Sequence, residues 1–197
     1  MAAGAHETSL GIDHRKLAMW TFLGSEFLFF GAFLATFLLY VQTTAGGPGV
    51  EIFDIPFTSI SSFVLLMSSL TMVLAHNAHT QGDLRRMRLW ILATAGQGAV
   101  FLGGQVFEFS VFVREGLTFG TSPFATSFYV LTGFHGAHVF IGILLLLSLY
   151  SFSLTGKVKA TQPLKTEMIG LYWHFVDIVW VVLFTVVYLI PEIAVLD

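Results

Sequence analysis

The sequence predicts an all-α protein that is embedded in a membrane and crosses it as a bundle of five helices. Of its 197 residues, 55% are hydrophobic and only 11% are charged, and the mean hydropathy is +0.81. An average soluble domain carries about 25% charged residues. This chain therefore has too little polar surface to cover a particle of its size in water, and lipid is the expected solvent for most of it.

The composition also excludes several kinds of chemistry. The chain contains no cysteine, which rules out thiolate catalysis, disulfides, iron–sulfur clusters and any copper or zinc site built on Cys. Nine Lys and Arg against twelve Asp and Glu give a net charge of −3, so there is no basic excess for nucleic-acid binding. Chemistry in this chain must use His, carboxylates or a partner.

Five stretches are nearly free of charge and long enough to span a bilayer as helices. At 1.5 Å per residue, about 20 residues cover a hydrocarbon core of roughly 30 Å. The first is not a cleaved signal sequence, because polar or mixed residues precede it and it exceeds an h-region in length. The predicted helices, in order, are residues 17–41, 58–79, 89–113, 126–152 and 170–191, within one membrane domain at 17–191 with tails at 1–16 and 192–197.

The ends of these stretches predict an orientation. Eight basic residues lie on the side of the N-terminal tail and of the loops after the second and fourth helices, whereas Arg114 alone lies on the other side. By the positive-inside rule the N-terminus is inside and the C-terminus outside. Four aromatic residues near the inner helix ends are expected to anchor the protein at the interface: Trp20, Trp90, Tyr172 and Trp173.

Glu26 is the most unusual residue inside a predicted span. It lies roughly 14 Å along the helix from Leu17, close to the bilayer midplane, and ionisable groups at that depth are costly and usually face the bundle interior. One hypothesis is an acid that exchanges or tunes the transfer of protons. The alternative is a neutral carboxylic acid that bonds two helices together.

His135 and His138 lie one turn apart in the middle of the fourth predicted helix and share a face. Two imidazoles at this spacing could form half of a metal or haem site, but a complete site needs further ligands at the same depth. The alternative is hydrogen bonding to neighbouring helices. We expect a contact between Glu26 and His138.

Gln105 and Glu108 lie one turn apart in the outer part of the third predicted helix. Glu108 is near the outer interface, where a carboxylate is easier to solvate. We expect Glu108 to pair with Gln105 or with a neighbouring helix, and a role in ion entry is the alternative.

His174 and Asp177 lie one turn apart near the inner end of the fifth predicted helix, where the acid can orient or charge the imidazole. With polar residues at the inner end of the second helix they could form a proton-collecting cluster. Structural pairing or contact with lipid headgroups is the alternative. These inner-end residues are His76, Asn77 and His79.

Three blocks together resemble the motifs of one known family. They are Ser25–Glu26–Phe27–Leu28–Phe29–Phe30, then Gly133–Phe134–His135–Gly136–Ala137–His138–Val139, and finally Tyr172–Trp173–His174–Phe175–Val176–Asp177–Ile178–Val179–Trp180. In this order they resemble subunit III of haem-copper terminal oxidases, such as cytochrome c oxidase subunit III. The last block is the most specific of the three, and the chain resembles the short form with five helices instead of seven.

The resemblance implies a membrane subunit that contains no redox centre and binds beside the catalytic haem-copper subunit I. Haems and copper would then lie in partner subunits, and bound phospholipid is expected. Glu26 matches the intramembrane glutamate of the family, and the resemblance implies that the subunit supports proton uptake, stability of the complex and lipid binding. The resemblance predicts no catalytic residue and no metal ligand here, and a location in a bacterial plasma membrane in preference to a mitochondrial inner membrane.

Other functions stay open at this point. A quinol oxidase subunit III or an accessory protein of nitric oxide reductase belongs to the same superfamily, and the electron donor is decided in another subunit. A small proton-coupled transporter would be active as an isolated protein. A metalloenzyme built on the His residues would purify with stoichiometric metal.

Overall fold

Five long helices make up nearly all of the computed structural model, which describes residues 13–161 and 163–190. A 3₁₀ turn, η1 (Val50–Ile52), precedes the second helix, and a π-helical turn, η2 (Phe184–Leu189), continues the fifth. The helices are α1 (His14–Tyr40), α2 (Ile55–Thr80), α3 (Leu84–Arg114), α4 (Pro123–Leu154) and α5 (Leu164–Leu183). Each is long and apolar enough to cross a membrane, which confirms the all-α prediction with five spans.

The predicted tails fall mainly outside this description. Residues 1–12 of the predicted N-terminal tail, the last residue of the fifth predicted span and the predicted tail 192–197 lie outside the described residues. Only the junction of the N-terminal tail with α1 is described.

Polar caps set where four of the helices begin. Asp13, Asp54 and Asp83 each accept a hydrogen bond from a backbone N–H in the first turn of α1, α2 and α3. Ser122 does the same for α4, whose first residue is Pro123. Such side chains satisfy N–H groups that have no partner within the helix, so each helix starts at its cap and not at its first apolar residue.

All five helices begin earlier than the apolar stretches predict, and α3 and α5 differ the most. α3 begins at Leu84 instead of residue 89 and has three arginines before residue 89, and α5 begins at Leu164 instead of residue 170. Hydropathy locates the segment that is stable in hydrocarbon, whereas backbone hydrogen bonding continues into the interface, where charged side chains are hydrated. The first turns of α3 and α5 therefore extend past the apolar part of each span.

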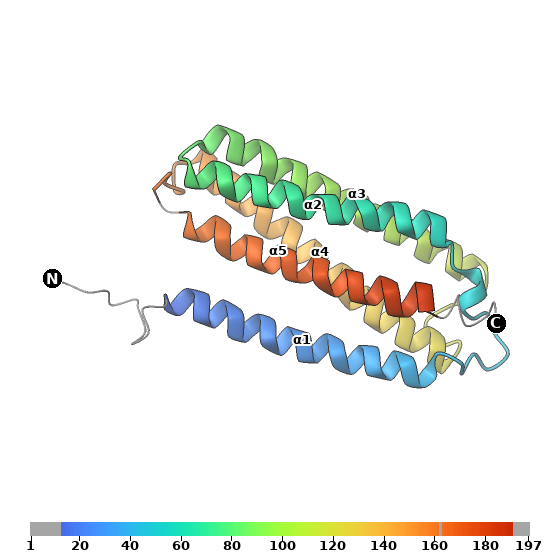
Figure 1. Ribbon diagram of the computed structural model, residues 1–197. Helices are drawn as coiled ribbons and strands as arrows, with labels where there is room; N and C mark the ends of the chain where they lie inside the picture. The colour runs from blue at the N-terminus through green and yellow to red at the C-terminus, as the bar shows by residue number, and fades with distance from the viewer. Residues whose placement is uncertain (1–12, 162, 191–197) are drawn as a thin grey trace.

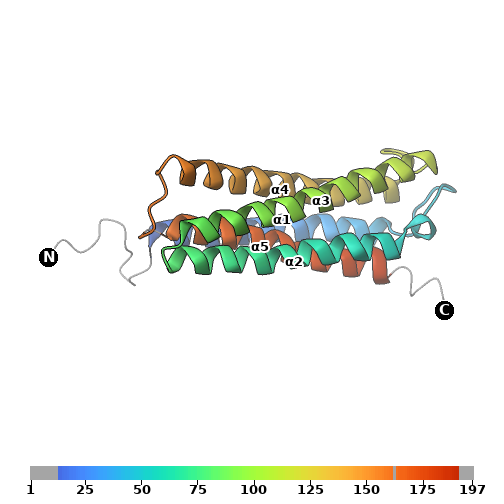
Figure 2. The same ribbon diagram turned by 90° about the horizontal axis from the view of Figure 1, so that it is seen from above.

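The helices run side by side along one common direction (Figures 1 and 2). α2 and α3 pack against each other as a hairpin, and α4 and α5 pack on this pair. α1 lies at the edge of the bundle, where it packs against α4 and α5 (Figure 1). α1 begins and η2 ends at opposite ends of the bundle, as an odd number of spans requires.

Trp173 on α5 lies at the centre of the bundle. Its side chain is fully buried, and its indole N–H donates a 2.8 Å hydrogen bond to Ser68 Oγ on α2. A Cβ on Gly98 of α3 would lie 2.5 Å from the ring, and one on Gly142 of α4 would lie 2.8 Å from it. Four helices thus meet at one indole, which corrects the expectation that Trp173 is an interfacial anchor.

Tyr172 is buried as well, whereas Trp20 fits the anchor expectation. Tyr172 is 4% exposed and Trp20 is 57% exposed. Because α5 starts at Leu164, Tyr172 and Trp173 lie more than two turns inside the helix and not at its end. The interfacial prediction failed for these two residues because it placed the start of the helix too late.

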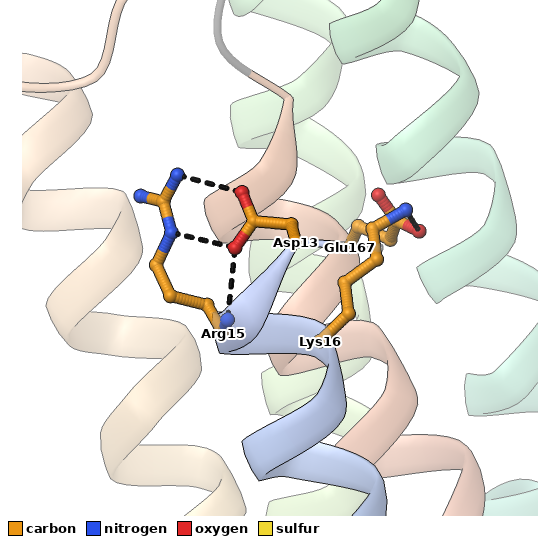
Figure 3. A network of polar contacts seen from close by, with 4 residues as sticks. All are labelled: Asp13, Arg15, Lys16 and Glu167. Atoms are coloured by element: carbon orange, nitrogen blue, oxygen red, sulfur yellow. Dashed lines mark hydrogen bonds and ion pairs between the residues drawn. The ribbon is translucent and has the colours of Figure 1, made fainter. Parts of the chain in front are cut away.

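Charged side chains tie the beginning of α1 to the beginning of α5 (Figure 3). Lys16 Nζ lies 2.5 Å from Glu167 Oε1. Beside this pair, Arg15 Nη2 lies 2.9 Å from Asp13 Oδ2, the cap of the same helix. About two-thirds of the surface of each of the Lys16 and Glu167 side chains is covered by the protein. This ion pair therefore connects α1, at the edge of the bundle, to α5.

Reversing one charge of this pair should lower stability slightly, and reversing the second charge as well should restore it. Lys16→Glu should lower the free energy of unfolding by about 0.5 kcal/mol, the usual range for a partly exposed pair, and the double variant with Glu167→Lys should recover it. The measurement is the unfolding midpoint in mixed micelles. A double variant no better than Lys16→Glu would show that the pair adds nothing to stability.

Candidate functional site

Glu26 on α1 and His138 on α4 meet inside the membrane-spanning region. Glu26 Oε2 lies 3.2 Å from His138 Nε2, and the two side chains are 19% and 14% exposed. The ring of Phe30 packs edge-on to the imidazole at a centroid distance of 5.0 Å. The polar pair therefore lies mostly enclosed at the seam between the helix at the edge and the rest of the bundle.

The second ring nitrogen of His138 determines how protons are arranged in the pair. His138 Nδ1 lies 2.7 Å from the carbonyl oxygen of Phe134, which can only accept, so Nδ1 carries a hydrogen. Nε2 then either accepts a proton from a neutral Glu26 or donates one to an ionised Glu26. In both cases the Glu26–His138 contact contains one shared proton.

The backbone of His138 is held from a third helix. Tyr172 Oη on α5 donates a 3.0 Å hydrogen bond to the carbonyl oxygen of His138. The carbonyl of a helical residue is normally used within the helix, so this is an additional bond that fixes α5 against the middle of α4. Sequence reasoning did not select Tyr172 for this position, although its place in the aromatic block next to Trp173 was the available signal.

His135 points away from the Glu26–His138 pair and into the core. Its ring is fully buried and stacks on Trp180 at 4.8 Å, with Phe101 edge-on at 5.9 Å. Neither ring nitrogen has a hydrogen-bond partner among the described residues. The two histidines of the motif thus have different contacts: His138 pairs with Glu26, and His135 packs against other aromatic rings.

Gln105 and Glu108 bond to neighbouring helices and not to each other. Gln105 Nε2 donates to the carbonyl oxygen of Thr132 on α4 at 2.9 Å. Glu108 accepts from Thr58 on α2 at 2.5 Å and from Tyr188 in η2 at 3.2 Å. Glu108 is 5% exposed, so it is a buried bridge among three elements and not an open entry point.

His174 and Asp177 on α5 share one serine of α2. Ser69 Oγ donates a hydrogen bond to Asp177 Oδ2 and lies 3.0 Å from His174 Nδ1. A hydroxyl has one hydrogen to donate, so Ser69 Oγ accepts from the Nδ1–H of His174. Ser69 was not predicted; the polar pair Ser68–Ser69 within an apolar stretch was the signal that could have found it.

The polar residues in the last turns of α2 belong to separate sites. His76 is near enough to His174 for their charges to interact. His79 instead bonds to Thr166 Oγ1 at 2.6 Å and to the carbonyl oxygen of Lys159 at 3.0 Å, and Asn77 accepts from Gln81 Nε2 at 3.3 Å. The structure therefore does not bring His76, Asn77 and His79 together with His174 and Asp177 as one cluster.

These contacts define a class of protein. The described residues contain no group of three or more His, Asp or Glu side chains placed to hold a metal ion. Glu26, Gln105 and Glu108 each join one helix to another. This is a polytopic helical membrane protein in which several intramembrane polar side chains connect neighbouring helices.

Comparison with known proteins gives the family. The family model described as cytochrome c oxidase subunit III matches residues 2–191. The chain belongs to the cytochrome c oxidase subunit III family, whose members are non-catalytic subunits of haem-copper oxidases. The resemblance predicted from the three sequence blocks is confirmed.

Individual relatives agree over nearly their whole lengths. The chain is 40% identical over 189 residues to cytochrome c oxidase subunit 3 of Bacillus sp. (strain PS3), covering 95% of this chain and 91% of the relative. It is 40% identical over 197 residues to cytochrome c oxidase subunit 3 of Thermostichus vulcanus, covering 94% and 95%. Quinol oxidase subunit 3 of Bacillus spizizenii is 40% identical over 176 residues, covering 88% and 85%. The relatives imply an integral membrane protein that associates with other oxidase subunits.

Proposed function

We propose that this chain is the non-redox subunit III of a cytochrome c oxidase in a bacterial plasma membrane, bound beside the haem-copper subunit I. Haems and copper lie in the partner subunits, and oxygen is reduced to water there with coupled proton pumping. The observation that carries the proposal is the family match over residues 2–191. The N-terminus lies inside and the C-terminus outside, as the distribution of basic residues predicts.

Within the complex, the Glu26–His138 pair supports proton uptake by the catalytic subunit. What supports this role is the pair's position in a membrane-spanning seam and the proton that its geometry requires. A carboxyl group and an imidazole that share one proton are neutral as a pair, and the proton can move between the two groups without changing the net charge of the site. Stability of the complex and retention of phospholipid are the other roles of the subunit.

The test of the function is to purify the tagged chain in mild detergent and record what copurifies. Haem a bands in the reduced-minus-oxidised spectrum, together with a partner that carries a dicopper site, are the expected result. Haem b or o without that copper would assign the chain to a quinol oxidase or to a relative linked to nitric oxide. A colourless, homogeneous preparation would contradict the proposal and favour a transporter.

Two substitutions of Glu26 distinguish a role in proton uptake from a role in helix packing. Glu26→Gln keeps a hydrogen bond to His138 Nε2 and removes the exchangeable proton, whereas Glu26→Leu removes both. If the pair supports proton uptake, Glu26→Gln already slows turnover or makes it decay, while the haem spectra of the complex stay unchanged. Steady-state oxygen consumption over repeated turnovers is the measurement.

A different result would contradict a role of the pair in proton uptake. Full activity of Glu26→Gln, with loss of stability in Glu26→Leu only, would make the pair a structural bond. Glu115→Gln, an exposed carboxylate at the end of α3, is the matched control and should behave as the unaltered protein. In infrared difference spectra, His138→Ala should shift the carboxyl band of Glu26, and an unchanged band would show that the pair does not share a proton.

A further inference from the structure

Tyr172 on α5 lies beside the Glu26–His138 pair and contacts both helices that carry it. Its hydroxyl donates a 3.0 Å hydrogen bond to the carbonyl oxygen of His138 on α4. Its ring stacks on Phe22 of α1 at a centroid distance of 6.5 Å, and it is near enough to Glu26 for their charges to interact. A single buried side chain of α5 therefore links the two helices whose relative position decides whether the pair forms.

The ring of Tyr172 rests on α4 one turn after His138. A Cβ on Gly142 would lie 3.3 Å from Tyr172 Cε1, so the absence of a side chain at Gly142 lets the ring approach the backbone of α4. The carbonyl oxygen of His138 also accepts the N–H of Gly142 within the helix. This oxygen therefore has two donors, and the donor from Tyr172 ties it to a different helix.

Aromatic rings hold α1 and α4 together on the opposite side of the pair. Phe29 and Phe33 of α1 pack on Phe134 of α4, each at a centroid distance of 5.3 Å. Phe134 precedes His138 by one turn, whereas Tyr172 contacts α4 after His138. Apolar contact is non-directional, whereas a hydrogen bond fixes both a distance and an angle. The bond from Tyr172 is therefore the contact that sets a specific position for the backbone of His138.

The contact between Glu26 and His138 is sensitive to that position. Glu26 Oε2 lies 3.2 Å from His138 Nε2, at the long end of the range for hydrogen bonds. Among the described residues no hydrogen bond joins Tyr172 to Glu26, so Tyr172 is suited to act on the shared proton through the position of His138. A shift of His138 away from α1 by a few tenths of an ångström would take Nε2 out of hydrogen-bonding range.

We infer that Tyr172 is a positioning residue for the Glu26–His138 pair: its hydroxyl holds the backbone of His138 where Nε2 can share a proton with Glu26. Tyr172 itself neither donates nor accepts the shared proton. The inference rests on the proposed role of the pair in proton uptake. The geometry of the pair and the rate of the oxidase are measured separately, so that each can fail without the other.

The test compares Tyr172→Phe with the unaltered protein in the purified complex. The infrared carboxyl band of Glu26, identified by its loss in Glu26→Gln, should move part of the way toward its position in His138→Ala. Steady-state oxygen consumption should fall about fivefold, the equivalent of one neutral hydrogen bond. The KM for the electron donor and the haem spectra should not change, because the proposed catalytic sites lie in partner subunits.

Matched variants separate the hydrogen bond from general damage to the fold. Tyr129 Oη also donates to a backbone carbonyl oxygen, that of Leu117, at 2.8 Å. Tyr129→Phe therefore removes the same kind of bond elsewhere, and it should leave the Glu26 band and the rate unchanged. Tyr172→4-aminophenylalanine keeps a donor at the same place and should restore both readouts. Haem spectra and elution of each complex show that it is intact.

Three results would overturn the inference. One is an unchanged Glu26 band in Tyr172→Phe. The second is an equal shift of this band in Tyr129→Phe, which would make the effect a general loosening of the bundle. The third is a failure of 4-aminophenylalanine to restore the band, which would assign the effect to packing of the ring. A shifted and restored band with full oxygen consumption would instead support the inference and contradict the proposed role of the pair in proton uptake.

Discussion

Gly98→Ala and Gly142→Ala are each expected to lower the free energy of unfolding by about 2 kcal/mol, the usual cost of overfilling a packed core. The added methyl group would lie 2.5 Å or 2.8 Å from the ring of Trp173. The ring cannot move aside, because Ser68 holds its N–H and the residue is fully buried. The measurement is the unfolding midpoint in mixed micelles.

Neighbouring glycines on the same helices provide the controls. Gly96 on α3 and Gly133 on α4 have no atom within 4 Å of an added Cβ. Gly96→Ala and Gly133→Ala should therefore be neutral or stabilising by up to about 1 kcal/mol, from helix propensity alone. If Gly142→Ala behaves as Gly133→Ala does, the packing of α4 against Trp173 is not tight.

A double substitution tests whether the added methyl group clashes with Trp173. Trp173→Phe removes part of the ring that faces Gly98 and Gly142, and it should lose stability in the otherwise unaltered protein. Combined with Gly98→Ala, it should cost less than the sum of the two changes, because contacting residues do not act additively. Strict additivity would mean that the clash is not with Trp173.

Glu108→Leu is expected to lower the free energy of unfolding by about 2 kcal/mol, the cost of leaving a buried hydroxyl without a partner. Tyr188 is 1% exposed, and Glu108 Oε2 is its hydrogen-bond acceptor. Thr58 is less affected, because its hydroxyl also lies 2.9 Å from the carbonyl oxygen of Asp54. Glu108→Gln keeps an acceptor for Tyr188 and should cost less than Glu108→Leu.

Replacing Tyr188 tests whether the cost of Glu108→Leu comes from its lost hydrogen bond. In Tyr188→Phe the hydroxyl is gone, so Glu108→Leu in that background should cost clearly less than it does alone. The same unfolding measurement applies to all four proteins of the cycle. Equal effects of Glu108→Leu in both backgrounds would show that the Glu108–Tyr188 bond does not stabilise the packing of η2.

The number of helices and their approximate positions were predictable because they depend on local properties of the chain. A helix of about 20 apolar residues is long enough to cross the hydrocarbon core of a bilayer. Its backbone hydrogen bonds form within the helix and need no neighbouring segment. The ends were less predictable. Asp13 and Asp83 cap their helices beyond the apolar stretches, and hydropathy does not register capping.

The polar residues inside the spans were also identifiable from the sequence, since ionisable groups in hydrocarbon are rare. The contact between Glu26 and His138 was expected, because two such groups at similar depth lower each other's cost by pairing. The sequence did not predict which side chains surround His135. Residues one turn apart are about 60° apart around a helix, and only the positions of α1 and α5 decide that one imidazole meets a carboxyl group and the other meets Trp180.

The sequence by itself thus determined the class of protein, the number of spans, the family motifs and the intramembrane residues of interest. Only the tertiary structure decided which helix each of these residues contacts, that Trp173 is a central wedge, and that Ser69, Thr58 and Tyr188 complete the polar sites. The physical reason is that hydrophobicity and helix formation act along the chain. The partners of a side chain depend instead on how whole helices are placed and rotated against one another.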